Sequence, residues 1–192
     1  RDEPGDAPDV MRGEETQIAG AVAEGGGDGL FVMPGTHSKW VEVRGGRILW
    51  FATFMTGEVF AVLSEHSILG RLMAEGDEPP GAFAAGLKAA DGPLLHRLFS
   101  ARTLGLFERL PAQGLRPYLS GLLIGAEILG ARAVLAARGA AVDRVAVVGG
   151  AALAARYAEA LHHFGIRAEP AAETVTTDGL FSIARAAGLT GR

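Results

Sequence analysis

The order in which strand-like and helix-like segments follow one another limits the folds open to this chain. Three short segments come first, at residues 30–33, 39–44 and 47–53, and they run apolar or alternate as β-strands do. A short turn and the pair Gly45-Gly46 separate them, so they predict a β-meander. Later, the apolar run 144–148 leads through a glycine turn into a helical segment and a short strand. Strands that first form hairpins and later alternate with helices predict a mixed sheet in an α/β or α+β fold.

The remaining segments have the apolar spacing of helices and are expected to flank this sheet. Predicted helices cover residues 14–23, 58–74, 82–90, 94–107, 117–138, 151–164 and 179–187. Pro117 suits the first turn of the longest helix, because a residue there needs no backbone N–H. Asp178 is the expected N-cap of the last helix, since its carboxylate can accept free N–H groups.

Composition excludes several classes of protein. Apolar residues make up 48% of the chain, which is enough for a globular core and argues against disorder. The formal net charge is −4 and the basic residues are scattered, so no nucleic-acid partner is predicted. Cysteine is absent, which excludes disulfides, thiolate metal sites and cysteine nucleophiles and fits a cytoplasmic protein. No purely apolar run reaches about 20 residues, so neither a membrane span nor a membrane partner is predicted.

The turn between the first two predicted strands is the first candidate site. It contains Gly35, Thr36, His37, Ser38 and Lys39. Glycine lets the backbone approach a ligand closely, and successive N–H groups with hydroxyls form a nest for anions such as phosphate. The lysine would add a positive charge. The alternative is an ordinary hairpin turn, in which glycine and serine are common.

Two adjacent carboxylates, Glu14 and Glu15, open the first predicted helix. One of them could accept a proton from a substrate hydroxyl. The alternative is structural, because acidic side chains are favoured in a first helical turn by the helix dipole.

The third candidate is the turn Gly149-Gly150-Ala151 between a buried strand and a helix, where a nucleotide could lie against the backbone. Glu169 lies about 20 residues on, as a ribose-binding acid would in a dinucleotide fold. The G-x-G-x-x-G fingerprint is absent, however, which disfavours a nicotinamide-dependent enzyme. The histidines show no spacing of metal ligands, so no metal-binding residue is predicted.

Taken in their order along the chain, with the carboxylates first, the Gly35 turn next and the Gly149-Gly150 turn last, the three candidates resemble the second lobe of the actin-like sugar kinases. More narrowly, the chain resembles the 2-dehydro-3-deoxygalactonokinase family from Asp9 onward. The segments that carry this resemblance are Asp9–Gln17, Pro34–Trp40, Met55–Glu58, His66–Gly70 and Ser120–Glu127. The expected fold is therefore an actin/ribonuclease H-like second lobe with a mixed sheet, an N-terminal β-meander and flanking helices.

The resemblance implies a transferase that phosphorylates 2-dehydro-3-deoxy-D-galactonate with ATP to its 6-phosphate, in galactonate breakdown. It implies that Glu14 or Glu15 is the base, although the wider superfamily has an aspartate there. The turn from Gly35 to Lys39 would hold the phosphate, and Gly149, Gly150 and Ala151 would flank the adenosine. Mg²⁺ is implied by the chemistry, held largely by phosphates and water. The alternatives are another sugar or sugar-acid kinase of this superfamily and a non-catalytic actin-like nucleotide-binding module.

The opening residues suggest how the chain is organised. Arg1 is not a methionine, and the family's first lobe with its Asp-x-Gly-Thr motif is not in the sequence. Residues 1–9 are therefore expected to be a linker from a missing N-terminal lobe. Residues 10–192 would form the C-terminal kinase lobe, with a helical insert at about 75–115. We expect such a lobe to expose apolar surface that its missing partner lobe would cover, which favours a homo-oligomer.

Overall fold

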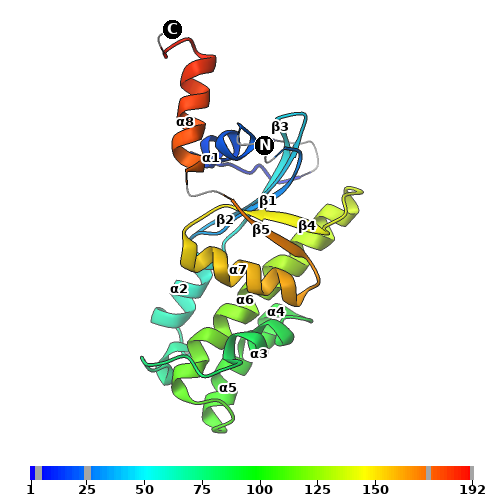
Figure 1. The fold of residues 1–192 in the computed structure, drawn as a ribbon. Helices are drawn as coiled ribbons and strands as arrows, with labels where there is room; N and C mark the ends of the chain where they lie inside the picture. The colour runs from blue at the N-terminus through cyan, green and yellow to red at the C-terminus, as the bar shows by residue number, and fades with distance from the viewer. Residues whose placement is uncertain (3–5, 24–26, 172–173, 191–192) are drawn as a thin grey trace. The chain divides into compact units, whose positions relative to one another are not determined.

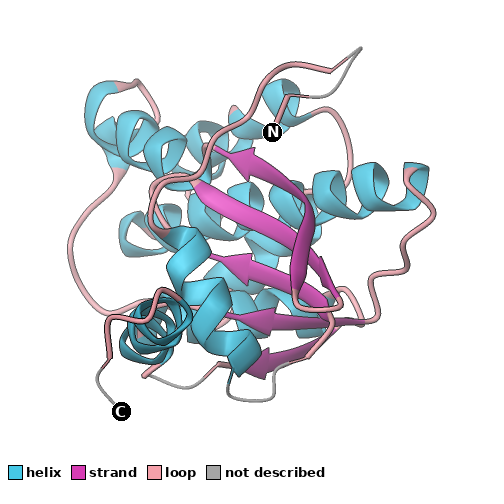
Figure 2. Ribbon diagram, turned by 90° about the horizontal axis from the view of Figure 1, so that it is seen from above, coloured by secondary structure: helices cyan, strands magenta, loops and turns pink. Residues whose placement is uncertain are grey.

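Five strands form one mixed sheet, which confirms the predicted meander and the α/β class (Figure 1). The computed structural model describes residues 1–2, 6–23, 27–171 and 174–190. The strands are β1 (Gly29–Met33), β2 (Ser38–Arg44), β3 (Arg47–Phe54), β4 (Arg144–Val147) and β5 (Arg167–Pro170). The strands lie side by side (Figure 2), and their order is β3-β2-β1-β4-β5. The first three pair antiparallel, whereas β4 is parallel to both β1 and β5.

Glycine chemistry sets the β2–β3 hairpin. Gly45 and Gly46 have φ of +57° and +69°, which is the backbone that a two-residue hairpin turn requires. A register shift at Glu42 and Val43 marks a β-bulge in the same pair. Residues 38–43 of β2 are all buried, so this strand is covered on both faces.

Helices cover both faces of the sheet in this unit, which comprises Arg1–Phe54 and Val142–Arg192. They are α1 (Glu14–Ala21), α7 (Ala151–His163) and α8 (Val175–Ala186). Ile18 of α1 and Val175 of α8 pack with Phe31 and Val41 on one face. Helix α7 contacts β4 and β5 and lies on the opposite side from α1 and α8 (Figure 1).

The last helix begins earlier than predicted. It starts at Val175 with Thr174 as N-cap, so Asp178 lies inside it and is not the cap. Gly179, the first residue of the predicted helix, lies inside α8 and makes a packing contact. A Cβ at Gly179 would lie 1.9 Å from the Thr16 carbonyl oxygen, and one at Gly20 would lie 1.8 Å from that of Val175. The two glycines therefore let the backbones of α1 and α8 touch.

A second unit, Met55–Ala141, is helical. It contains α2 (Thr56–His66), a 3₁₀ helix η2 (Gly70–Leu72), α3 (Ala82–Ala89), α4 (Leu94–Leu98), α5 (Ser100–Leu106) and α6 (Ala112–Ala137). Gly86 and Gly121 bring α3 and α6 into backbone contact in the same way as in the first unit, because a Cβ at either would lie within 2.1 Å of a carbonyl oxygen.

Three of the predicted helices differ from the observed ones in this unit. The helix expected to reach residue 74 ends at His66, because Ser67 bonds the Leu63 carbonyl and the Leu69 N–H with its own hydroxyl. Helix α6 begins at Ala112 after Pro111, and Pro117 lies within it instead of in its first turn. The predicted helix 94–107 is divided at Phe99 into α4 and α5.

Helix α6 is also, within the described residues, the one helix long and apolar enough to cross a membrane. In its most apolar window 56% of the residues are buried inside the structure, and α3 packs along it. Glu127 in its middle is buried as well. These features are those of a core helix, so α6 is weak evidence for a membrane span.

Candidate functional site

The predicted phosphate turn and the predicted adenosine turn lie together at one end of the sheet, where the parallel strands β1 and β4 finish. Strand β1 ends at Met33 and the parallel strand β4 ends at Val147, so both turns leave the sheet on the same side. The N–H of Val148 bonds the carbonyl oxygen of Val32. A Cβ placed on Gly149 would lie 3.6 Å from Cδ of Pro34. From this edge β1 connects to β2 on one side and β4 connects to β5 on the other, which makes it a topological switch point of the kind where ligands bind.

One glycine of each turn faces open space. A Cβ at Gly35 or at Gly150 would have no heavy atom within 4 Å, and neither residue has a positive φ. Thr36 and His37 are exposed beside Gly35. Gly150 is the N-cap of α7, with Ala151 as the first helical residue, and no side chain caps that end. Backbone N–H groups at a helix N-terminus attract anions, so this edge offers room and positive potential to a phosphate.

Ser38 and Lys39 behave differently from the exposed part of the turn. Ser38 is fully buried, and its Oγ accepts a hydrogen bond of 3.4 Å from the hydroxyl of Tyr157 on α7. Lys39 is 4% exposed, and its Nζ donates to the carbonyl oxygen of His37 at 3.3 Å. These two side chains therefore hold the turn in place from below. Sequence reasoning did not single out Tyr157, because a tyrosine within an alanine-rich helix is typical of a core position.

Glu14 approaches the same turn from α1. Its Oε1 lies 3.4 Å from Nζ of Lys39, and its Oε2 accepts the N–H of Arg12 at 2.7 Å. Burial alone would raise the pKa of Glu14, but backbone hydrogen bonds and Lys39 outweigh it and lower the pKa below its usual value. Glu14 is thus an ionised carboxylate next to the predicted phosphate turn.

Glu15 has a different setting. It is exposed, and its Oε2 accepts the N–H of Gly13 at 2.8 Å. Gly13 itself has a φ of +105°, in the left-handed region that favours glycine. Both acids therefore satisfy N–H groups ahead of α1, as the structural alternative expected, and Glu14 also reaches the turn.

The described residues do not form a metal site of their own. No group of three or more His, Cys, Asp or Glu side chains among them could hold an ion. The carboxylate of Glu14, beside the predicted phosphate turn, is occupied by Lys39 and a backbone N–H. The residues beside the turn therefore do not make a Mg²⁺ cage.

Comparison with known proteins gives a consistent result. The family model described as 2-keto-3-deoxy-galactonokinase matches residues 1–183. A protein from Rhizobium meliloti (strain 1021), named probable 2-dehydro-3-deoxygalactonokinase, is 45% identical over 93% of this chain and 60% of its own length. The 2-dehydro-3-deoxygalactonokinase of Escherichia coli (strain K12) is 39% identical over 94% of this chain and 61% of its own.

A crystal structure from Sinorhizobium meliloti, also described as a 2-dehydro-3-deoxygalactonokinase, superposes with a TM-score of 0.82 at 42% identity. It matches 94% of this chain and 61% of that protein. The chain thus spans about 60% of the length of the curated relatives it matches.

Proposed function

The chain belongs to the 2-keto-3-deoxy-galactonokinase family, and we propose on that premise that it carries the catalytic carboxylate and the ATP-binding turns of a sugar-acid kinase. One observation carries the proposal beyond family membership. Three features lie together at the end of the sheet where β1 and β4 finish: the carboxylate of Glu14, the open turn at Gly35 and the turn at Gly149. A kinase needs a carboxylate, a phosphate cradle and a nucleotide turn within reach of one another.

The proposed reaction is phosphorylation of 2-dehydro-3-deoxy-D-galactonate by ATP. The oxygen of the terminal hydroxyl forms a bond to the γ-phosphorus, and the bond from that phosphorus to the β–γ bridging oxygen breaks. The products are the 6-phosphate of the sugar acid and ADP. The proton of the hydroxyl passes to a carboxylate of the protein.

We assign that carboxylate to Glu14. It lies on the side of the phosphate turn, next to Lys39, whereas Glu15 is exposed and bonds the N–H of Gly13. The lowered pKa of Glu14 keeps it ionised at neutral pH. Phosphoryl transfer through a loose transition state depends mainly on positioning, so a weakly basic carboxylate that orients the hydroxyl is sufficient.

The phosphates of ATP would lie over the exposed side of the turn at Gly35 and Thr36. The buried residues Ser38 and Lys39 would fix the shape of that turn from below. The adenosine would lie against the backbone from Gly149 to Ala151, where the N-terminus of α7 favours a nearby phosphate. Mg²⁺ would come with ATP and be held by phosphates and water.

The finer features of the fold belong to the same proposal. We take the sheet and its helices as an actin/ribonuclease H-like second lobe, with residues 1–9 as a linker and a helical insert at about 75–115. An N-terminal lobe would supply the first phosphate loop. The family likeness and the chain's 60% share of its relatives' length support this arrangement. A cytoplasmic location stays a prediction.

A substrate panel with ATP tests the proposal. The full-length protein should release ADP with 2-dehydro-3-deoxy-D-galactonate at a kcat/KM at least tenfold above that with other sugars and sugar acids. If the protein prefers another sugar, it is a sugar kinase with a different substrate. Nucleotide binding without phosphorylation of any sugar would favour the non-catalytic actin-like module.

A further inference from the structure

We propose that Asp9 is a positioning residue that ties the segment leading into α1 to the edge of the sheet, and thereby holds Glu14 beside Lys39. This inference rests on the proposed function, because its consequence for catalysis requires Glu14 to act on the substrate hydroxyl. It concerns a residue that neither binds ATP nor touches the sugar acid in the scheme above.

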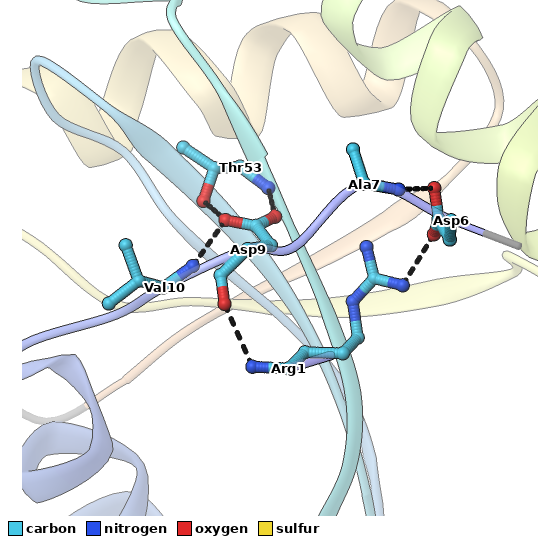
Figure 3. Close-up of polar contacts among 6 residues, drawn as sticks. All are labelled: Arg1, Asp6, Ala7, Asp9, Val10 and Thr53. Atoms are coloured by element: carbon cyan, nitrogen blue, oxygen red, sulfur yellow. Dashed lines mark hydrogen bonds and ion pairs between the residues drawn. The ribbon is translucent and has the colours of Figure 1, made fainter. Parts of the chain in front are cut away.

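The contacts of Asp9 are short and specific (Figure 3). Its Oδ1 accepts the hydroxyl of Thr53 at 2.6 Å and the N–H of Val10 at 2.8 Å. Its Oδ2 accepts the backbone N–H of Thr53 at 2.8 Å. Its own N–H and carbonyl oxygen bond the backbone of Arg1. Both carboxylate oxygens of Asp9 therefore bind β3, and the bond to Val10 fixes the direction in which the chain leaves.

Thr53 is the significant partner because of its place in the sheet. Strand β3 is one of the two edge strands, so the N–H of Thr53 is bonded by Asp9 and not by a further strand. In the register of the sheet, Thr53 lies opposite Lys39 of β2. Lys39 in turn lies 3.4 Å from the carboxylate of Glu14.

Asp9 and Glu14 thus bind the same cross-strand pair from the two ends of one short segment. Asp9 binds Thr53, Glu14 binds Lys39, and only residues 10–13 separate the two acids. Within that segment the N–H groups of Arg12 and Gly13 bond the carboxylates of Glu14 and Glu15. A shift at Asp9 is therefore transmitted over a short and internally bonded stretch to the carboxylate of Glu14.

Asp9 is suited to this task as an ionised group. Burial would raise its pKa, but the hydrogen bonds from Thr53 and Val10 and the charge of Arg1 outweigh burial and lower it. An amide in its place keeps the size and one oxygen acceptor but cannot accept on both sides. Asp9→Asn is for this reason the substitution that weakens the contacts of Asp9 with Thr53 and Val10 while disturbing the rest of the structure least.

The experiment compares Asp9→Asn with Thr53→Val in the full-length enzyme. Displacing a catalytic group by about 1 Å can cost on the order of 10²-fold in rate, so Asp9→Asn should lower kcat by roughly 10–100-fold. The KM for ATP should stay within about twofold of the wild-type value, because the nucleotide turns are untouched. Thr53→Val keeps the N–H and loses only the hydroxyl, so its fall in kcat should be smaller.

A double-mutant cycle separates positioning from general stability. If Asp9 acts through Glu14, Asp9→Asn should have almost no further effect on kcat in a Glu14→Gln background. Asp28→Asn is the matched control, since Asp28 also binds a backbone N–H, that of Gly46, at the far end of the same hairpin. Its kcat should stay within about twofold of wild type.

Amide hydrogen exchange gives a readout that does not depend on activity. In Asp9→Asn the N–H groups of Thr53, Arg12 and Gly13 should all exchange faster, whereas loss of protection at Thr53 alone would overturn the inference. A wild-type kcat in Asp9→Asn, or additive losses with Glu14→Gln, would overturn it too. If the wild-type protein phosphorylates no sugar acid, the proposed function fails. Hydrogen exchange alone then decides whether Asp9 holds the segment that leads into α1.

Discussion

At the scale of single residues, Glu14 and Glu15 are neighbours in sequence with different surroundings. Glu14 reaches Lys39 and Glu15 bonds the N–H of Gly13. Glu14→Gln should therefore lower kcat by about 10²–10⁴-fold in the full-length enzyme, and it should also lower the melting temperature, because the ion pair with buried Lys39 is lost. Glu15→Gln should keep most of its turnover and lose about 0.3–1 kcal/mol of unfolding free energy, the usual contribution of an acid in a first helical turn.

Steady-state kinetics and urea unfolding of the two variants check this division. If Glu15→Gln loses turnover and Glu14→Gln does not, the roles are exchanged. If both retain near-normal kcat, the base lies elsewhere in the protein.

Gly35 gives a second test at this scale. Because a Cβ there meets no protein atom and its φ is not positive, Gly35→Val should fold with an unchanged melting temperature. A side chain would nevertheless occupy the space proposed for phosphate, so kcat/KM for ATP should fall by at least tenfold. Gly29→Val is the matched control, since Gly29 lies at the other end of β1 and also faces open space. Equal kinetics for the two variants would show that the phosphate lies away from this turn.

The acids of this region also give a pH dependence of stability. Folding lowers the pKa of Glu14 below its ordinary 4.5 and that of Asp9 below its ordinary 3.8. A lowered pKa means that the unfolded chain binds protons more readily, so the stabilisation is fully present above these ordinary values and is lost as pH falls below them. The free energy of unfolding should be measured with urea at pH 7, 5 and 3.5. The contribution of Asp9 and Glu14 to it should change little between pH 7 and pH 5. Between pH 5 and 3.5 Asp9→Asn should lose less stability than wild type, and an equal loss would contradict the assignment.

At the scale of elements, the sequence predicted strands better than helix ends. Local chemistry marks the strands, because Gly45-Gly46 favours a tight hairpin and the apolar run 144–148 ends at a glycine pair. The starts of α6 and α8 were wrong because Pro117 and Asp178 resemble residues that begin a helix, and Gly179 was therefore placed at the start of α8. Gly179 is instead required by the backbone contact with α1, a tertiary feature that no local pattern contains.

The candidate site could be predicted in part for the same reason. The residues of the two turns and the acids of α1 follow from glycine positions and from the family resemblance. The contacts that join them do not, since the bonds from Asp9 to Thr53 and from Tyr157 to Ser38 connect residues 44 and 119 positions apart in sequence. Only the folded sheet brings these partners together.

The contact between α1 and α8 yields a prediction for Gly179. A methyl group there would lie 1.9 Å from the Thr16 carbonyl oxygen, so the helices must move apart. Gly179→Ala should lower the unfolding free energy by about 1–3 kcal/mol, the usual cost of overpacking. It should also lower kcat, because α1 carries Glu14 at its N-terminus. Leu180→Ala, on the exposed side of the same helix, should change the unfolding free energy by less than about 0.5 kcal/mol. If the two variants lose the same stability, the contact between α1 and α8 is not the cause.

At the scale of the whole molecule, the proposed second lobe has consequences for the 192-residue chain by itself. If another lobe supplies the first phosphate loop, this chain should show no sugar phosphorylation with ATP. Large apolar side chains are exposed on each unit, among them Phe181 on α8 of the sheet unit and Phe107 at the end of α5 in the helical unit. Such surfaces favour association, so the purified chain should form oligomers whose size depends on concentration.

Activity assays and light scattering should compare the purified 192-residue chain with a longer protein that spans the full length of its relatives. The comparison decides whether a second lobe is required for catalysis. The longer protein should phosphorylate the sugar acid and the 192-residue chain should not, although both should keep the site around Glu14 and Lys39. Hydrogen exchange at Arg12, bonded by Glu14, reports on that site in either form. Measurable sugar phosphorylation by the 192-residue chain would show that the sheet edge described here is sufficient for catalysis, and the requirement for a second lobe would then be wrong.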